Sequence, residues 1–123
     1  MAIRILCADD QNGFRERSVR NFLDLHVLHL LQEDDRHGYE ILQELDERTQ
    51  TQISPGTLYP LLYELEKEGL IFGRWADPAD NTERNRRIYS ITEKGQMYRQ
   101  DSLRNIERLL QSKNIVEEAI ITA

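Results

Sequence analysis

The sequence predicts a mainly α-helical domain of the α+β class, with one β-hairpin in its second half. Apolar residues recur at helical spacing over three segments before residue 70, two short runs of strand-forming residues follow, and a further amphipathic segment comes last. At 123 residues the chain fits one compact domain, or one domain with a terminal extension.

The chain begins with a short apolar run, Ile3, Ile5 and Leu6, that leads into Asp9-Asp10. Taken alone, this run resembles the first strand and acidic pair of a two-component receiver domain. The rest of such a domain is missing, and two adjacent carboxylates cannot complete the oxygen shell of a divalent ion. We therefore expect residues 1–14 to form a tail or a short strand.

Two helices are expected before the middle of the chain. Residues 14–33 predict one long, largely buried helix, with an apolar face made by Phe22, Leu23, Val27, Leu28, Leu30 and Leu31. Residues 38–48 predict a shorter helix, with Tyr39, Leu42 and Leu45 on one stripe and Ile41 alongside. A polar connector at residues 49–52 separates this helix from the next.

The third helix has the clearest start signal. Ser54 suits the N-cap position, and Pro55 suits the first helical position, where a missing N–H has no cost. A leucine stripe follows and Gly69 is the expected C′ residue, the stripe being Leu58, Leu61, Leu62 and Leu65. Pro60 leaves one carbonyl without a helical donor, so we expect it to bend the helix entry without breaking the helix.

Residues 70–75 and 86–91 predict the two strands of a hairpin with a long polar tip. Tyr89 alternates with Ile91 on the expected core face, and Trp75 is expected to pack under the hairpin. Thr92 then caps a fourth helix that runs to about residue 112, or to the end of the chain.

This order of elements is that of a winged helix-turn-helix with a two-stranded wing and a C-terminal helix. In such modules the helix after the turn lies in the DNA major groove, and the wing reaches an adjacent groove or the backbone. We assign residues 15–95 to the winged-helix domain and residues 96–123 to a dimerisation helix. The candidate DNA-binding residues are Tyr39, Ser54, Pro55, Gly56, Thr57, Tyr59, Tyr63, Arg84, Arg86 and Arg87.

Four ordered motifs between residues 19 and 110 resemble the signatures of PadR-like transcriptional regulators. They are His37-Gly38-Tyr39-Glu40-Ile41, Ser54-Pro55-Gly56-Thr57-Leu58-Tyr59-Pro60-Leu61-Leu62, Leu65-Glu66-Lys67-Glu68-Gly69-Leu70-Ile71 and Arg86-Arg87-Ile88-Tyr89-Ser90-Ile91-Thr92-Glu93-Lys94-Gly95. The first twelve residues lie outside the family pattern, and the short last helix has no tryptophan to stack on a flat ligand.

The resemblance implies a homodimeric repressor whose C-terminal helix packs against the partner's N-terminal and C-terminal helices. It further implies that Thr57 and Tyr59 touch DNA, that the Arg86-Arg87 stretch supports the wing, and that a small aromatic or planar cationic effector binds near the dimer interface. The expected DNA target is a double-stranded, pseudo-palindromic operator.

The last helix carries apolar residues at heptad-like positions, which favours a dimer seam over packing on the protein's own core. A three-helix winged module is closed without this helix, and an isolated amphipathic helix needs a partner. The residues expected at the seam are Phe22, Leu103, Ile106, Leu109, Leu110, Val116 and Ile120.

The net charge of −6 seems to argue against nucleic acid as a partner, but the charge is unevenly distributed. Residues 1–47 carry five basic and eleven acidic side chains, whereas residues 48–99 carry eight basic and seven acidic ones. Local potential governs where a polyanion approaches. The alternative interpretation, which the acidity favours, is a winged-helix protein–protein interaction module without DNA binding.

Other functional classes find little support. No nucleophile–base or carboxylate pair recurs at catalytic spacing, so we expect no enzyme and no cofactor. His26, His29 and His37 lack the cysteines or the tight grouping of a zinc site. A single cysteine, Cys7, fits a reducing cytosol, and neither a signal peptide nor a membrane span is evident, so we expect a cytoplasmic protein.

Overall fold

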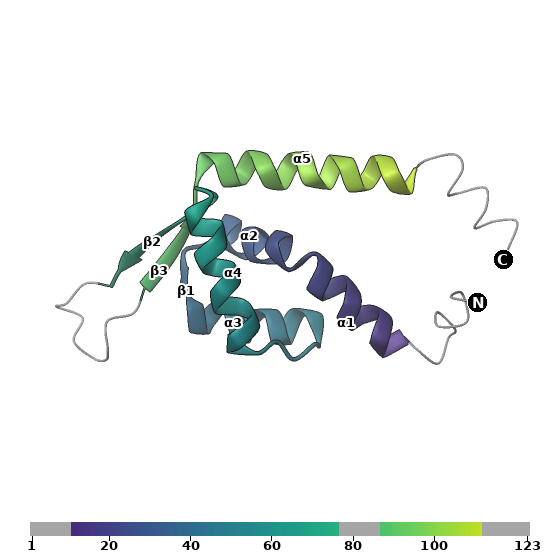
Figure 1. Ribbon diagram of the computed structural model, residues 1–123, viewed down its shortest axis with the longest axis horizontal. Helices are drawn as coiled ribbons and strands as arrows, with labels where there is room; N and C mark the ends of the chain where they lie inside the picture. The colour runs from purple at the N-terminus through teal and green to yellow at the C-terminus, as the bar shows by residue number, and fades with distance from the viewer. Residues whose placement is uncertain (1–10, 77–86, 112–123) are drawn as a thin grey trace, which may run out of the picture.

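The computed structural model of the chain describes residues 11–76 and 87–111. In this part of the chain four helices come first, with one short strand between the second and the third, and two strands and a last helix follow (Figure 1). The helices and strands are α1 (Gln11–Asn21), α2 (Leu23–Glu33), β1 (Arg36–His37), α3 (Gly38–Thr49), α4 (Pro55–Lys67), β2 (Ile71–Trp75), β3 (Arg87–Ile91) and α5 (Glu93–Leu110). The predicted mainly α, winged helix-turn-helix class is confirmed.

The first predicted helix is two helices. Phe22, with φ −112° and ψ 25°, separates α1 from α2, and its side chain is 42% exposed. The backbone hydrogen bonds nearly continue across the break, because Phe22 N–H donates to the Ser18 carbonyl and His26 N–H donates to the Phe22 carbonyl. The spacing of apolar residues does not reveal an interruption of the helix at a single residue. The prediction of one long helix was therefore wrong at Phe22. The predicted start was also late, since α1 begins at Gln11.

The remaining helix boundaries follow the capping signals. The Ser54 side chain accepts a hydrogen bond from Thr57 N–H at 3.2 Å, and Gly69 adopts the left-handed conformation with φ 79° that a C′ residue needs. The helix runs unbroken through Pro60, as predicted. At the last helix the Thr92 hydroxyl accepts from Gly95 N–H at 3.0 Å.

The sheet has three antiparallel strands in the order β1-β3-β2, where the sequence predicted a hairpin of two. β1 was missed because a two-residue strand has no periodicity of its own. It exists by pairing with β3, Arg36 lying opposite Tyr89 and His37 opposite Ile88. Between β2 and β3, Gly73 faces Tyr89 and Trp75 faces Arg87. The residues of the predicted wing tip lie outside the described part of the chain.

The core lies where α2, α3, α4 and the sheet meet. Its fully buried side chains are Val27, Leu28, Leu30, Ile41, Leu45, Leu58, Leu62 and Ile71. Tyr89 is buried with them, as predicted, whereas Tyr39 lies on the solvent side of α3 and not on its apolar stripe. The leucine stripe of α4 is confirmed, with Leu61 only partly buried.

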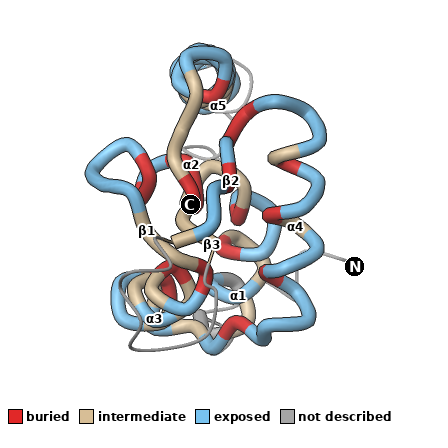
Figure 2. Tube along the Cα trace, turned by 90° about the vertical axis from the view of Figure 1, so that its left-hand side faces the viewer, coloured by how far each residue is buried: buried red, intermediate tan, exposed pale blue. Residues whose placement is uncertain are grey.

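α5 packs along α2 and runs along one side of the domain (Figure 1). Figure 2 shows it at the edge of the fold with most of its surface exposed, and Gly95 is its one buried residue. Two side-chain contacts hold it to α2: Tyr98 donates to Asp24 at 3.0 Å, and Arg99 lies 2.9 Å from His29 Nδ1. The helix therefore presents a broad unpaired face.

Candidate nucleic-acid interface

The solvent-facing side of α4 carries the predicted recognition residues. Ser54, Pro55, Gly56 and Thr57 are all exposed at its N-terminus. The hydroxyls of Ser54 and Thr57 lie 3.0 Å apart, within hydrogen-bond distance of each other. Tyr59 and Tyr63 follow along the same helix with 43% and 67% of their surfaces exposed. The opposite side of α4 is the buried leucine stripe, so this helix presents hydrogen-bonding groups outward from a rigid base.

Tyr59 is held by close contact with the start of α3. A Cβ atom added to Gly38 would lie 2.6 Å from Cε1 of the Tyr59 ring. The ring therefore needs a glycine at this position to lie against the helix. On the neighbouring turn Tyr39 is exposed, and its hydroxyl accepts a hydrogen bond from Gln43 at 3.2 Å. Three predicted tyrosines thus lie on the exposed surface of the helix-turn-helix.

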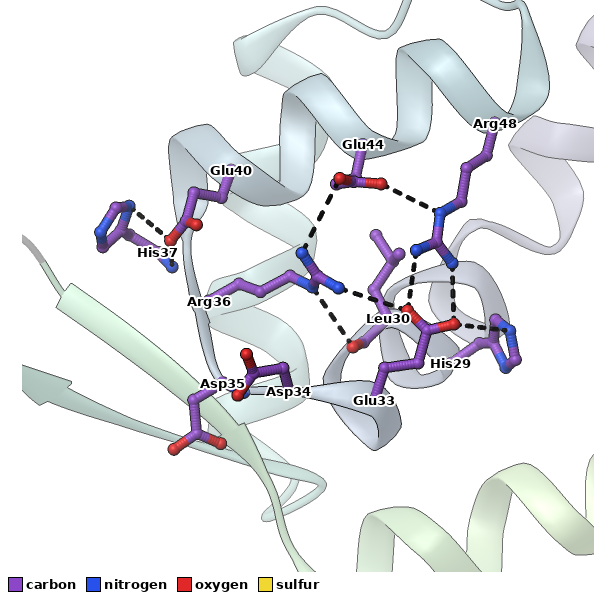
Figure 3. A network of polar contacts seen from close by, with 10 residues as sticks. All are labelled: His29, Leu30, Glu33, Asp34, Asp35, Arg36, His37, Glu40, Glu44 and Arg48. Carbon is purple, nitrogen blue, oxygen red and sulfur yellow. Dashed lines mark hydrogen bonds and ion pairs between the residues drawn. The ribbon is translucent and has the colours of Figure 1, made fainter.

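A network of ion pairs fixes α3 to the end of α2 (Figure 3). Arg48 donates two hydrogen bonds to the Glu33 carboxylate, at 2.8 and 3.0 Å, and one to Glu44 at 3.0 Å. Arg36 lies between the same two carboxylates, 3.2 Å from Glu33 and 3.9 Å from Glu44. Hydrogen bonding from Arg48 lowers the pKa of Glu33 and, in turn, raises the pKa of Arg48. Several of the acidic residues that dominate the first third of the chain are therefore paired internally.

Arg87, predicted as a DNA contact, lies at the base of the wing and is engaged within the protein. Its guanidinium is hydrogen-bonded to Glu66 and to the Gly73 carbonyl, and it lies 5.2 Å from the centre of the Trp75 ring. Trp75 is itself 61% exposed, so the prediction that it packs under the wing was wrong. Arg84 and Arg86 lie outside the described residues.

Glu66 and Gly73 are the partners that the sequence analysis missed. Glu66 lies near the C-terminal end of α4, and nothing in its spacing along that helix points to the wing. A signal did exist in the strand pattern. Gly73 lies two positions after the buried Ile71, and Arg87 lies two positions before the buried Tyr89. Residues two apart on a strand share a face, so both lie on the inner side of the sheet.

The candidate dimerisation residues gather along α2 and α5. Phe22, Leu103, Leu109 and Leu110 are exposed, and Leu110 is exposed over 65% of its surface. A groove of about 360 Å³ runs between the two helices and is lined by Phe22, Leu25, His26, His29, Arg99, Leu103 and Ile106. Burial, with the nearby His29 as a smaller cause, lowers the pKa of His26. Val116 and Ile120 lie outside the described residues.

The three histidines are not brought together. His29 contacts Arg99 and lies 3.6 Å from Glu33, and His37 lies 2.9 Å from Glu40. In the described ranges no three His, Cys, Asp or Glu side chains are arranged to hold a metal ion. Among these same residues, no helix combines the length and the apolar character that a membrane span needs.

The chain is similar to known proteins in family pattern, in sequence and in structure. The family model of the PadR-like transcriptional regulators matches residues 27–101. The transcriptional regulator Rv3488 of Mycobacterium tuberculosis is 37% identical over 98 residues, which are 78% of this chain and 82% of that protein. A second relative, from Lysinibacillus sphaericus, is 40% identical over 86 residues, 68% of this chain and 77% of its own.

Two solved structures are similar to the described fold. A transcriptional regulator from Clostridium thermocellum superposes with a TM-score of 0.68 at 29% identity, covering 80% of this chain and 95% of that one. Bacillus subtilis PadR in complex with operator DNA superposes with a TM-score of 0.59 at 26% identity, covering 66% of this chain and 46% of that one.

Proposed function

Because the chain belongs to the PadR-like family of transcriptional regulators, we propose that it is a sequence-specific DNA-binding repressor that acts as a homodimer in the cytoplasm. The observation that carries this proposal is the division of α4 into a buried leucine stripe and an exposed face of hydroxyl-bearing residues. One side of the helix packs in the core, and the other side is free to form hydrogen bonds with a ligand. The operator-bound relative supports the same use of the fold.

Base contacts are proposed for the exposed side of α4. Ser54, Thr57, Tyr59 and Tyr63 would face the major groove, while the first turn at Pro55 and Gly56 approaches the phosphates. Tyr39, next to this surface on α3, would contact the backbone. Arg84 and Arg86, at the wing, would contact the flanking phosphates or a narrow minor groove.

A homodimer is proposed because α5 exposes an apolar face that a monomer would leave in water. Leu103, Leu109, Leu110 and Phe22 are each more than two-fifths exposed. A second copy that lays its own α5 against this face would cover these side chains, and Val116 and Ile120 would extend the seam. Two copies related by a twofold axis would present two α4 helices to a pseudo-palindromic site.

A small aromatic effector is proposed for the groove between α2 and α5. Its walls are mostly apolar, with Phe22, Leu25, Leu103 and Ile106, and its polar end carries Arg99 and two histidines. A planar apolar body fits such walls, and an anionic substituent would pair with Arg99. Because the groove shares Phe22, Leu103 and Ile106 with the proposed dimer seam, its occupation would change how the two copies pack and so the distance between the two α4 helices.

The experiment that tests DNA binding is a mobility shift of the protein on the DNA upstream of its own gene, with unrelated DNA as competitor. We expect a specific shift that Tyr59→Phe, which removes only a hydroxyl, weakens. Repression is read separately, from a reporter gene under that upstream region. If no specific shift occurs at low salt, the acidic protein–protein interaction module becomes the better description.

A further inference from the structure

Three elements meet at one guanidinium below the wing. Arg87, from β3, is hydrogen-bonded through Nη2 to the Glu66 carboxylate at the end of α4 and to the Gly73 carbonyl of β2, the latter at 3.0 Å. The backbone N–H of Gly73 donates to the same Glu66 oxygen at 3.3 Å. The recognition helix and both wing strands are thus joined through one residue.

Two aromatic rings and a glycine surround the rest of this guanidinium. The Trp75 ring centre lies 5.2 Å from the Arg87 Cζ atom and the Tyr89 ring centre lies 6.0 Å from it. A Cβ atom on Gly73 would come within 2.5 Å of Arg87 Nη2 and 2.9 Å of its Nε. Glycine at this position therefore leaves the space that the guanidinium occupies.

We propose that Arg87 is a positioning residue that fixes the wing to the recognition helix, and that it does not contact DNA. The proposal rests on the proposed DNA-binding function. The charge of Arg87 is matched by Glu66, and both side chains are about two-thirds buried. A phosphate contact through Nη2 would require this nitrogen to leave both Glu66 and the Gly73 carbonyl. In place, the guanidinium sets the spacing between the helix in the major groove and the wing on the flanking backbone.

Substitution of Glu66 separates positioning from phosphate contact. If Arg87 is a positioning residue, Glu66→Gln weakens operator binding by about tenfold, since the wing loses its anchor to α4. If Arg87 contacts phosphate, Glu66→Gln removes a competing carboxylate and binding becomes tighter or stays unchanged. Tighter or unchanged binding by Glu66→Gln would overturn the proposal.

The salt dependence of operator binding is a second test of whether Arg87 contacts a phosphate. Arg87→Gln should lower affinity by a similar factor and leave the slope of log Kobs against log[salt] unchanged. Loss of a phosphate contact would instead reduce that slope by about 0.9 for each protomer. The double variant should bind no more weakly than either single variant, because both remove the same contact. Gly73→Ala keeps the charges of Glu66 and Arg87 but fills the space that the guanidinium occupies, so it should lower operator affinity as well.

The sole tryptophan of the chain allows the contact to be tested without DNA. Trp75 emission from the free protein should shift in both Glu66→Gln and Arg87→Gln, because each displaces the guanidinium from the ring. Arg74→Gln is the matched control, since Arg74 lies next to Trp75 on β2 but pairs with Asp35 at 3.4 Å. Circular dichroism establishes that each variant is folded, and Arg87→Lys gives a milder change should Arg87→Gln unfold.

The two proposals fail in distinguishable ways. If the wild-type protein binds no operator, the proposed function fails while the emission test of the Arg87 contacts still stands. If the wild type binds and the emission of Glu66→Gln and Arg87→Gln matches that of Arg74→Gln, the positioning role of Arg87 is wrong and DNA binding is unaffected.

Discussion

At the scale of single residues, the recognition helix depends on a serine that has two separable tasks. Ser54 caps α4 by accepting from Thr57 N–H, and it is exposed at the end of the helix that we propose faces DNA. An aspartate can perform the first task but not the second. Its carboxylate accepts the same hydrogen bond, whereas its charge repels phosphate.

We therefore expect Ser54→Ala to lower the free energy of unfolding by about 1 kcal/mol, because the first turn of α4 loses its cap. Ser54→Asp should keep wild-type stability and yet bind operator much more weakly. Urea unfolding and a mobility shift on the same preparations measure the two effects. Wild-type DNA affinity in Ser54→Asp would show that the N-terminus of α4 does not approach phosphate.

His26 gives the fold a dependence on pH. Burial lowers its pKa from 6.5, the neighbouring His29 adds to the decrease, and Asp24 opposes it. Arg99 lines the same groove. Because the unfolded chain takes up this proton at a higher pH than the folded one, the contribution of neutral His26 is complete above 6.5 and declines as the pH falls toward the folded-state pKa.

The free energy of unfolding should thus rise as the pH is raised toward 6.5, and His26→Gln should flatten that rise. Protein concentration has to be held constant in these measurements, because formation of the proposed dimer would itself add stability. An unchanged slope in His26→Gln would assign the pH dependence to other groups.

Residues with a local signal were the predictable ones. The caps Ser54 and Thr92 and the C′ residue Gly69 follow from side-chain chemistry within a few positions, and all three occur as predicted. Trp75 and Arg87 could not be placed in this way, since their positions depend on Glu66, which lies 21 residues before Arg87 in the chain. A contact of that kind exists only once the strands have paired.

At the scale of elements, the amphipathic helices and the hairpin were predictable from the sequence. The helix break and the strand that forms only by pairing with another strand were not. The apolar pattern of residues 14–33 runs through the break at Phe22 without change, so it predicted one helix where there are two. β1 has two residues and forms by pairing with β3. Thr57, Tyr59 and Tyr63 are exposed on α4, as a DNA contact requires, but their contact with DNA and the role of α5 stay predictions.

The proposed dimer seam is tested on α5 itself. Leu103→Glu places a charge on the apolar face and should convert the dimer into a monomer, which light scattering with size-exclusion chromatography measures. Operator affinity should fall by at least tenfold, because two linked binding sites become independent. Asn105→Glu is the matched control, an exposed polar residue of the same helix with the same introduced charge. A dimer that persists in Leu103→Glu places the seam elsewhere.

At the scale of the whole molecule, the net charge of −6 is compatible with DNA binding because of where the acidic groups lie. Glu33 and Glu44 are paired with Arg36 and Arg48 between α2 and α3, and Glu66 is paired with Arg87 under the wing. The exposed face of α4 near its N-terminus carries hydroxyls, with no acidic residue in the first turn. Affinity should accordingly depend on shape and base contacts more than on bulk charge.

We propose above that two copies of this chain place two α4 helices in successive major grooves. Hydroxyl-radical and methylation protection of the upstream DNA measures where the protein lies. We expect two protected segments related by a dyad, with centres about 34 Å apart, which is one helical turn. A single protected segment, or uniform protection at all positions, would contradict it.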